Sequence, residues 1–400
     1  MKAMKFEVNR QAMLEAAKSV SKVVPSFSTS EILKQILLES NDDTGEVYMT
    51  ATNNEVSIQH KVIASVEESG SLLIDPRLLV GMMAKLEGDF ISLFTPSDKP
   101  ELLKVTSKRC TFQINCTDSR GYPRPTMPFP DESVIMTGIC SLAKRTTFLV
   151  SKDETKPALQ CVQVKLKNNA VHATASDGVR MMLVKDSAEH NDECEFLLPG
   201  RSLQVLASIS RDDDVFEIGD IGREIVFVRG DMIFTIKKLI EGNFIDTATL
   251  LKNIKPIYIT VVDVHKMKEA LSLISVVALS GVTIKPINLV LSNNEIILQC
   301  DDDLTEGSSI IPSKVSQNTP DAGFYYDVSA LIKLFNVVSG KVKLEIDARG
   351  IILIKTRSEA YLQAPVRPPE KKESTPVEQE EKCAKGAKNV KETKETKGVA

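Results

Sequence analysis

The residues that most often carry catalysis or bind metals are sparse in this sequence. It has only four histidines, and no two of them stand at the spacing of metal ligands: His60, His172, His190 and His265. Its seven cysteines contain no Cys-x-x-Cys pair, which a zinc site would need, and their odd number does not suit a framework of disulfides. We expect the first six to be reduced and mostly buried as small hydrophobic residues: Cys110, Cys116, Cys140, Cys161, Cys194 and Cys300.

Sequence motifs of catalysis are also missing. There is no Gly-x-x-x-x-Gly-Lys-Ser/Thr phosphate loop, no Gly-x-Gly-x-x-Gly, no Gly-x-Ser-x-Gly and no His-Glu-x-x-His. Acidic runs at 211–214 and 301–303 lack the glycine and the terminal glutamate of a calcium loop, and their positions suit turns. The sequence therefore predicts a non-enzymatic protein with no metal and no cofactor; an enzyme with an unrecognised site is an alternative.

The composition is that of a globular chain with more than one domain. Charged residues make up 26% and hydrophobic residues 42% of the 400 residues. The longest stretch without a charged residue is 15 residues, at 270–284, whereas a membrane span needs about 20 apolar residues. The N-terminus has no apolar core of a secretory signal. We expect a cytoplasmic protein that does not enter a membrane.

The last part of the chain differs from the rest. Residues 368–400 contain eight lysines and seven glutamates, no aromatic residue, and repeated Lys-Glu-Thr. Such a segment cannot bury enough apolar surface to offset the entropy of ordering, so we expect it to be disordered. Cys383 lies within it.

The preceding part repeats itself three times. Similar strand-like segments lie at 47–54, 171–178 and 296–303, and aligning them makes Thr50, Thr174 and Gln299 equivalent, at offsets of 124 and 125. A second landmark recurs at 73–79, 197–203 and 325–331, and a third pairs 120–123 with 241–244. The repeat predicts three related domains at 1–128, 129–254 and 255–367.

Each repeat shows the same order of expected elements. A short strand leads into an amphipathic helix, with Met13, Leu14, Ala17, Val20 and Val24 at helical spacing in the first repeat. Strands with period-two alternation follow, then a second helix and further strands. The expected helices lie at 11–23, 76–86, 138–148, 200–210, 263–275 and 327–338. The fold class is α+β with mostly antiparallel sheets.

The expected helices are mildly basic although the whole chain has a net charge of -4. The helices together carry +6, whereas the remainder of residues 1–367 carries -11. Such segregation favours a surface that faces a polyanion and contacts phosphates without reading bases. The alternative is that the lysines of ordinary amphipathic helices simply extend into water. The basic residues are Lys18, Lys22, Arg77, Lys85, Lys144, Arg145, Arg201, Lys266, Lys268 and Lys333.

Several short motifs occur in the order typical of a known family. They are Met-Lys-Phe at 4–6, Thr-Ala-Thr at 50–52, Arg-Gly-Tyr-Pro at 120–123, Ala-Ser-Asp-Gly-Val-Arg at 175–180, Leu-Ile-Glu-Gly-Asn-Phe at 239–244 and Tyr-Leu-Gln-Ala-Pro-Val-Arg at 361–367. With the threefold unit, they resemble the bacterial DNA polymerase III beta subunit, the sliding clamp and processivity factor, over residues 4–367.

The resemblance implies three clamp domains, each with two helices on antiparallel sheets, that close into a ring as a head-to-tail homodimer. The helices would line a hole around double-stranded DNA, bound without sequence preference. The implied partners are the DNA polymerase III alpha subunit, the clamp loader and other proteins with a clamp-binding motif. The alternative is a divergent homologue that serves as a protein scaffold without a polymerase role.

The resemblance also implies a groove between the second and third domains that binds a short apolar motif of client proteins. Carried over position by position, its residues are Leu159, Ser176, Gly178, Val179, Arg180, Met181, Ile245, Leu250, Leu362, Ala364, Pro365, Val366 and Arg367. The family usually has His or Tyr at the position of Val179 and Pro at that of Ile245, so we expect altered specificity.

Other positions depart from the family at expected DNA contacts. An arginine common in the first domain is replaced by Phe27. Aromatic contacts of the second domain fall on Pro157 and Ala158, where Lys152 and Lys156 are basic residues within reach. For the contact between subunits, the candidates are Phe112 and Ile114 on an edge strand of one chain, against Val276 and Val277 of the other.

Overall fold

The computed structural model describes residues 3–187, 193–239, 244–280, 285–292, 294–301, 306–315 and 322–368. The chain divides into two compact units: unit 1 comprises Met1–Val261 and Val337–Ala364, and unit 2 comprises Val262–Asn336 and Pro365–Ala400. The expected disorder of residues 369–400, the repeat landmark at 241–243 and the acidic residues 302–303 lie outside the described residues.

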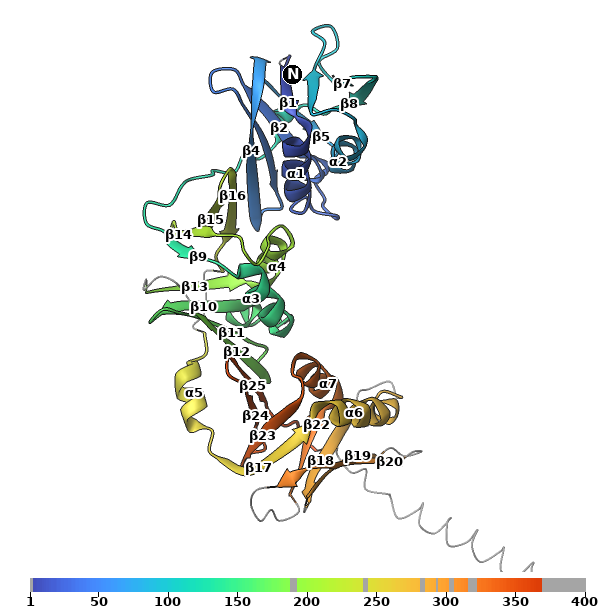
Figure 1. The fold of residues 1–400 in the computed structure, drawn as a ribbon, viewed down its shortest axis with the longest axis vertical. Helices are drawn as coiled ribbons and strands as arrows, with labels where there is room; N and C mark the ends of the chain where they lie inside the picture. The colour runs from blue at the N-terminus through green and yellow to red at the C-terminus, as the bar shows by residue number, and fades with distance from the viewer. Residues whose placement is uncertain are drawn as a thin grey trace, which may run out of the picture. The chain divides into compact units, whose positions relative to one another are not determined.

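The elements follow one another in the predicted repeating order (Figure 1). The first repeat contains β1 (Lys5–Asn9), α1 (Arg10–Ser21), β2 (Ile36–Asn41), β3 (Glu46–Thr52), β4 (Val56–Glu68), β5 (Gly70–Ile74), α2 (Pro76–Lys85), β6 (Phe90–Phe94), β7 (Leu102–Ser107) and β8 (Cys110–Asn115). The second contains β9 (Val134–Met136), α3 (Ile139–Thr146), β10 (Cys161–Lys167), β11 (Ala170–Ser176), β12 (Arg180–Ser187), β13 (Cys194–Pro199), α4 (Gly200–Ser208), β14 (Phe216–Asp220), β15 (Glu224–Arg229) and β16 (Met232–Lys237).

The third repeat follows a short additional helix, α5 (Thr247–Asn253). It contains β17 (Pro256–Asp263), α6 (Val264–Ala278), β18 (Pro286–Ser292), β19 (Glu295–Asp301), β20 (Glu306–Pro312), β21 (Lys314–Val315), β22 (Ala322–Asp327), α7 (Val328–Val337), β23 (Lys341–Asp347), β24 (Ile352–Lys355) and β25 (Glu359–Gln363). Short 3-10 turns lie at η1 (Glu31–Lys34), η2 (Ser119–Gly121), η3 (Thr147–Leu149) and η4 (Pro157–Gln160).

The strand register confirms the threefold repeat. Thr50 of β3 lies opposite Leu37 and Gln59, Thr174 of β11 opposite Gln163 and Leu183, and Gln299 of β19 opposite Asn288 and Ser308. The same antiparallel order therefore occurs three times, as β4-β3-β2-β5, β12-β11-β10-β13 and β20-β19-β18-β22. In each case a helix follows the last strand, namely α2, α4 and α7.

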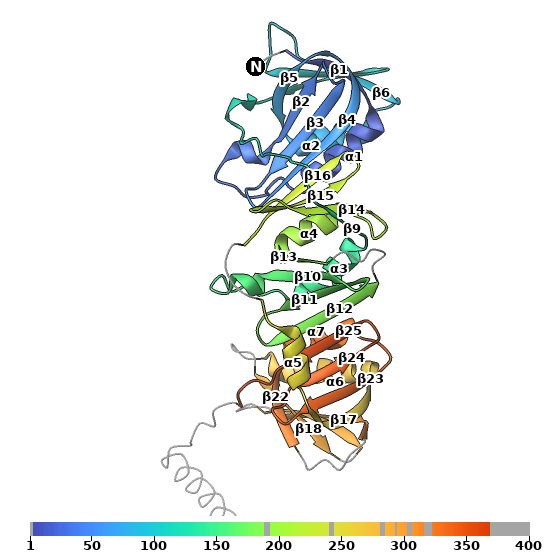
Figure 2. The same cartoon turned by 90° about the vertical axis from the view of Figure 1, so that its left-hand side faces the viewer.

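Within unit 1, successive repeats are joined by continuous sheet. β16 pairs antiparallel with β4, with Ile236 opposite Val56, and β25 pairs antiparallel with β12, with Leu362 opposite Met181. Figure 2 shows β10, β11 and β12 continuing into β25 and β24. Strand pairing satisfies the backbone groups across each junction, so each junction has the hydrogen-bond pattern of a sheet interior.

The six predicted helices are confirmed, with ends that shift by a few residues. Asn9 and Asp75 cap α1 and α2: the Asn9 carboxamide oxygen accepts from the Ala12 amide at 3.0 Å, and the Asp75 carboxylate accepts from the Arg77 amide at 2.7 Å. The predicted apolar stripe of α1 is buried except for Val24, which lies beyond the end of the helix and is half-buried.

The two helices of each of the first two repeats, α1 and α2 and then α3 and α4, lie on one side of the sheets of unit 1. α1 packs against α2, and α3 packs against α4, on the same side in Figure 1. α5 lies on the other side, over β12 and β25. Among the described residues no helix is long and apolar enough to cross a membrane.

Candidate functional site

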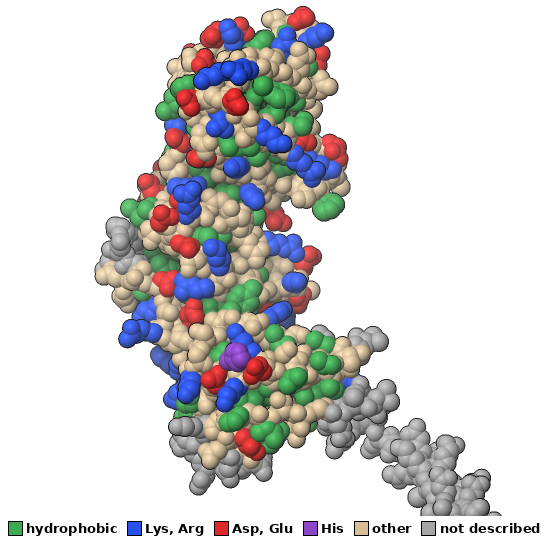
Figure 3. All heavy atoms as spheres, turned by 45° about the vertical axis from the view of Figure 1, so that its right-hand side comes forward, with side chains coloured by type: hydrophobic (Ala, Val, Ile, Leu, Met, Phe, Trp, Pro, Cys, Tyr) green, Lys and Arg blue, Asp and Glu red, His purple; other side chains and the backbone are tan. Residues whose placement is uncertain are grey.

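The helix-borne cations predicted to face DNA are largely free. Within the described residues, none of them except Arg145 has a carboxylate within ion-pair distance. Lys268 is half-buried, and the others are exposed: Lys18, Lys22, Arg77, Lys85, Lys144, Arg201, Lys266 and Lys333. Figure 3 shows lysine and arginine side chains distributed over the side that carries the helices.

Many strand-borne cations, by contrast, hold carboxylates. Lys61 Nζ lies 3.0 Å from Glu46, Lys165 Nζ 3.3 Å from Glu195 and Lys343 Nζ 2.8 Å from Glu345. Positive charge on the strands is therefore partly cancelled locally, whereas that on the helices is available to an external anion.

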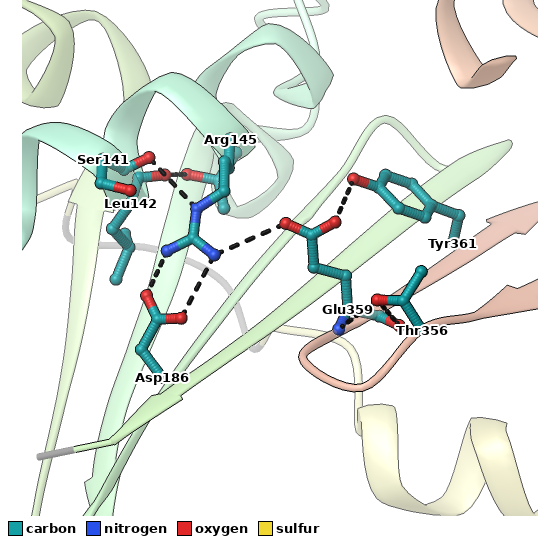
Figure 4. Close-up of polar contacts among 8 residues, drawn as sticks. Ser141, Leu142, Arg145, Asp186, Thr356, Glu359 and Tyr361 are labelled. Carbon is teal, nitrogen blue, oxygen red and sulfur yellow. Dashed lines mark hydrogen bonds and ion pairs between the residues drawn. The ribbon is translucent and has the colours of Figure 1, made fainter. Parts of the chain in front are cut away.

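Arg145 departs from this pattern, because its guanidinium is engaged inside the protein (Figure 4). It forms an ion pair with Asp186 of β12, and its Nη1 lies 3.5 Å from Glu359 Oε1 at the start of β25. The Tyr361 hydroxyl donates to the other oxygen of Glu359 at 3.0 Å. The Arg145 side chain is 26% exposed. The structure thus places the Arg145 guanidinium in an internal ion-pair network at the junction of the second and third repeats, unlike the other predicted DNA-facing residues.

The two additional basic candidates lie on a compact loop between η3 and η4. Lys152 and Lys156 are exposed, and the ends of the loop are closed by a hydrogen bond from the Ser151 amide to the Leu159 carbonyl at 2.8 Å. Pro157 and Ala158 form the start of η4, and Ala158 is only 9% exposed. The positions where the family has aromatic contacts are therefore occupied here by a short turn flanked by free lysines.

The first part of the predicted client groove is a tight turn at 176–180. The Asp177 carboxylate accepts from the amides of Val179 at 3.0 Å and Arg180 at 2.7 Å, and Gly178 has φ +92°. A positive φ favours glycine at this place. Val179 is 46% exposed at the tip, whereas Arg180 is held by Asp177 at 2.6 Å.

The turn is joined to the third repeat by hydrogen bonds of unit 1. The Ala364 amide donates to the Val179 carbonyl at 2.9 Å, and Arg180 lies opposite Gln363 in the β12–β25 pair. The Ser176 hydroxyl donates to the Arg180 carbonyl at 2.7 Å. A Cβ on Gly178 would lie 3.5 Å from Leu159 Cδ1. The structure therefore brings Leu159, Ser176, Gly178, Val179, Arg180 and Ala364 together.

The apolar part of the groove lies beside this turn, under α5. Met181 and Leu362 are buried in one cluster, and Ile245 and Leu250 pack against it from the α5 segment. The same cluster contains residues that the sequence did not single out: Ile254, Leu353 and Ala360 in the core, with Leu183, Leu251 and Ile351 packed against it. Asp246, which caps α5, was a usable sign of this helix, because it precedes Thr-Ala-Thr-Leu-Leu.

The last three groove candidates belong to unit 2. Pro365 and Val366 are half-buried, Arg367 is exposed, and the Val366 amide donates to the Tyr325 carbonyl of β22 at 2.7 Å.

The four residues predicted for the subunit contact differ in exposure. Phe112 of the edge strand β8 is 43% exposed and Val276 of α6 is 71% exposed. Ile114 is only 7% exposed, so its side chain belongs to the core of its own repeat; Val277 is half-buried beside Gly307. The sequence missed further exposed apolar side chains of unit 2: Leu273 on α6, Leu279 directly after it and Ile310 on β20.

Potential metal ligands are dispersed in the part of the chain that the structure describes. There, no group of three or more His, Cys, Asp or Glu side chains is placed to hold a metal ion. Cys140, Cys161 and Cys300 are buried, but Cys110 is exposed, so the expected burial holds for only part of the set. Burial raises the pKa of the Cys116 and Cys161 thiols to about 12, which keeps both protonated.

Comparison with known proteins gives the same family over successive parts of the chain. Residues 4–128 match the family model of the DNA polymerase III beta subunit, N-terminal domain, and residues 136–246 match that of its central domain; together they span more than half of the chain. The beta sliding clamp of Staphylococcus aureus is 26% identical over 324 residues, covering 77% of this chain and 81% of the relative. That of Bacillus subtilis is 26% identical over 261 residues, covering 62% and 68%.

Solved structures show the same fold across the repeats. A putative DNA polymerase III beta subunit from Eubacterium rectale has a TM-score of 0.80 at 18% identity, covering 91% of this chain and 99% of that one. The beta subunit from Thermotoga maritima has a TM-score of 0.79 at 18% identity, covering 92% and 100%. With its threefold strand order, its paired helices and these matches, the chain belongs to the DNA polymerase III beta subunit family, the bacterial sliding clamps.

Proposed function

We propose that this protein is a DNA sliding clamp that acts as a head-to-tail homodimer. Two chains close into a ring around duplex DNA and tether the DNA polymerase III alpha subunit and other clients, after loading by the clamp loader. The protein performs no catalysis, works in the cytoplasm, and is organised as domains at 1–128, 129–254 and 255–367.

The observation that carries this proposal is the freedom of the helix-borne cations. A protein that binds duplex DNA without sequence preference does so through phosphates, and each contact needs a cation that has no internal partner. Arg77 and Arg201 meet this condition, as do other exposed members of the set; Lys144 has no carboxylate within ion-pair distance, although it is hydrogen-bonded to Cys140. Their small number suits sliding, because a stronger attraction would slow movement along the DNA.

The sheet topology supports the head-to-tail arrangement. The last strand of the second repeat, β16, pairs with β4 of the first, and the last strand of the third repeat, β25, pairs with the equivalent strand β12 of the second. By the same rule, the last strand of the first repeat, β8, requires an equivalent of β4 and β12. That equivalent is β20 of a third repeat, and both β8 and β20 are edge strands among the described strands. Pairing β8 of one chain with β20 of the next gives a heterologous contact, which closes after two chains.

Exposed apolar side chains support the same contact. Phe112 lies on β8, Ile310 lies on β20, and Leu273 and Val276 lie on α6, which packs against β20. Large exposed apolar groups that gather on two edges are typical of surfaces that a partner covers.

The client groove is the second functional element of the proposal. The turn at 176–180 provides a polar rim, and the cluster around Met181, Leu250 and Leu362 provides an apolar floor. Such a combination suits a short linear motif with apolar anchors.

A retention assay on circular DNA tests the clamp function. Reversing Arg77, Lys144 and Arg201 together to Glu should reduce retention of the loaded protein on nicked circular DNA by about tenfold or more, since three phosphate contacts become repulsive. The matched control reverses three exposed cations outside the helices, Lys99, Arg223 and Lys341, and should leave retention unchanged. Equal losses in both variants would contradict the assignment of the helices. Escape of the wild-type protein when the circle is linearised is the mark of a closed ring.

A further inference from the structure

A cavity lies within unit 1, and its lining residues Pro157 and Gln160 flank the groove candidate Leu159 in the sequence. It has a volume of about 600 Å³, within the range of pockets that hold small ligands. Its walls come from the turn between β3 and β4, the segment after α3, the start of α4 and the end of β16. Both the first and the second repeat therefore contribute to it.

One part of the cavity wall is cationic. Lys152, Arg201 and Lys237 line it, and none of the three has a carboxylate partner among the described residues. Lys238 also lines it but is paired with Asp220.

Two carboxylates, Glu55 and Glu154, line the cavity as well. They leave a small excess of free positive charge, so an anion would bind near the cations and away from these two groups.

The start of α4 adds donors at the same wall. The residue before the helix is Pro199, whose side chain cannot cap it, so the amides of the first turn keep the partial positive charge of a helix N-terminus. Gly200 allows the start of α4 to pack closely on the protein itself, since a Cβ there would lie 2.8 Å from the Val150 side chain. Ser202, which also lines the cavity, is 2% exposed, and its hydroxyl has no hydrogen-bond partner in the described part of the chain. A buried hydroxyl without a partner, next to cations that are not paired, could donate its hydrogen bond to an anion bound in the cavity.

Another part of the wall is apolar, although Asn54, Thr147, Ser151, Gln160 and Gln204 also line the cavity. Phe148, Val150, Pro157 and Leu239 line it. A ligand that fills the cavity therefore needs an anionic group at one end and a flat apolar group at the other. A nucleotide has this chemistry, because its base stacks on aromatic and apolar side chains while its phosphate binds cations.

We propose that this cavity binds an unpaired nucleotide of single-stranded DNA, with its phosphate at Arg201, Lys152 and the start of α4 and its base against Phe148 and Pro157. The inference rests on the proposed clamp function, which brings DNA to the helix-bearing side. Paired bases are stacked inside the duplex and cannot enter a cavity, so the site distinguishes a single strand from a duplex. A clamp with such a site would favour DNA with a single-stranded segment next to the duplex it encircles.

Binding measurements on the full-length protein test this site. The probes are a fluorescein-labelled oligo(dT), a blunt duplex of equal length and dTMP, with fluorescence anisotropy as the readout for the DNA probes and competition for dTMP. The variant Gln204→Trp places a large side chain at an exposed position of the cavity wall without changing charge. Stacking of a base contributes about 1–3 kcal/mol, and the new side chain would occupy the space of the base. This variant should therefore weaken oligo(dT) binding about tenfold and leave duplex binding unchanged. The matched control, Gln11→Trp, adds the same side chain at an exposed position of α1 and should change neither.

A second measurement locates the bound base directly. Photocrosslinking with an oligonucleotide that contains 5-iodouracil should attach it to the segment that carries Phe148 and Pro157, as read by mass spectrometry. Crosslinks elsewhere, equal affinity for dTMP and oligo(dT), or full oligo(dT) binding by Gln204→Trp would each overturn the proposal. These outcomes are distinct from failure of the clamp function, which appears as loss of wild-type retention on circular duplex DNA.

Discussion

At the scale of single residues, Arg145 shows how the surroundings of a side chain decide its role. By sequence it is a basic residue on a basic helix next to Lys144. In the structure it links α3 to β12 and β25 through Asp186 and Glu359, while Lys144 remains exposed. A hydrogen bond with the Cys140 thiol raises the pKa of Lys144, so this lysine keeps its charge at neutral pH. Two adjacent residues thus differ in their surroundings: Arg145 is held inside the fold, whereas Lys144 is one of the residues that we propose for DNA contact.

We expect Arg145→Met to destabilise unit 1 by about 1–3 kcal/mol, because it leaves the half-buried Glu359 without its cation. Urea denaturation followed by circular dichroism measures the change. The control is Arg120→Met, which removes an ion pair with Asp118 whose arginine side chain is 85% exposed. Exposed pairs contribute about 0–1 kcal/mol, so the control should change little. Similar effects of both substitutions would show that the Arg145 network adds no special stability.

At the scale of elements, the connecting helix α5 contributes to the proposed client groove. It lies between the second and third repeats in sequence, and its Leu250 packs on the cluster that contains Met181 and Leu362. Because α5 packs on this apolar cluster, its residues form part of the wall of the proposed groove. Its Asp246 cap accepts from the Ala248 amide at 3.1 Å.

Leu250→Ala should weaken binding of a peptide from the polymerase alpha subunit about tenfold, since it removes an apolar contact from the proposed groove. Fluorescence polarisation with a labelled peptide measures this. Lys252→Ala, on an exposed position of the same helix, is the control and should bind normally. Unchanged peptide binding by Leu250→Ala, with the fold intact, would exclude α5 from the groove.

At the scale of the whole molecule, the proposed assembly depends on the edges of the sheets. Each junction inside unit 1 pairs the last strand of one repeat with β4 or β12 of the repeat before it, and in the proposed dimer the edge strands β8 and β20 form the same kind of pair between chains. The buried Ile114 stabilises its own repeat, whereas Phe112, Val276 and Ile310 are exposed and available to a partner.

Val276→Glu combined with Ile310→Glu should shift the protein from dimer to monomer, because it places charges in an interface that the partner would desolvate. Sedimentation velocity across a range of concentrations measures the shift. Ile63→Glu changes an equally exposed apolar residue on β4, 76% exposed, and should remain a dimer. A fully dimeric double variant would place the subunit contact elsewhere.

Much of the fold was predictable from the sequence, because periodicity and repetition are local properties. Helical spacing located six helices, and the equivalence of Thr50, Thr174 and Gln299 agrees with their places in the strand register. The short α5 was missed, since seven residues carry too little periodic pattern to predict a helix. The tight turn at 176–180 was predicted from the sequence, because Asp-Gly favours a turn through its local backbone conformation.

What the sequence could not determine depends on contacts between residues far apart in the chain. The pairing of Arg145 with Glu359, the burial of Ile114 and the cavity lined by Asn54, Arg201 and Lys237 all join segments that only the folded sheets bring together. Residue type and spacing thus defined the repeats, the helices and the excess of positive charge on them. Tertiary structure alone decided which charges stay free, because a cation is available to an external partner only where the fold places no carboxylate beside it.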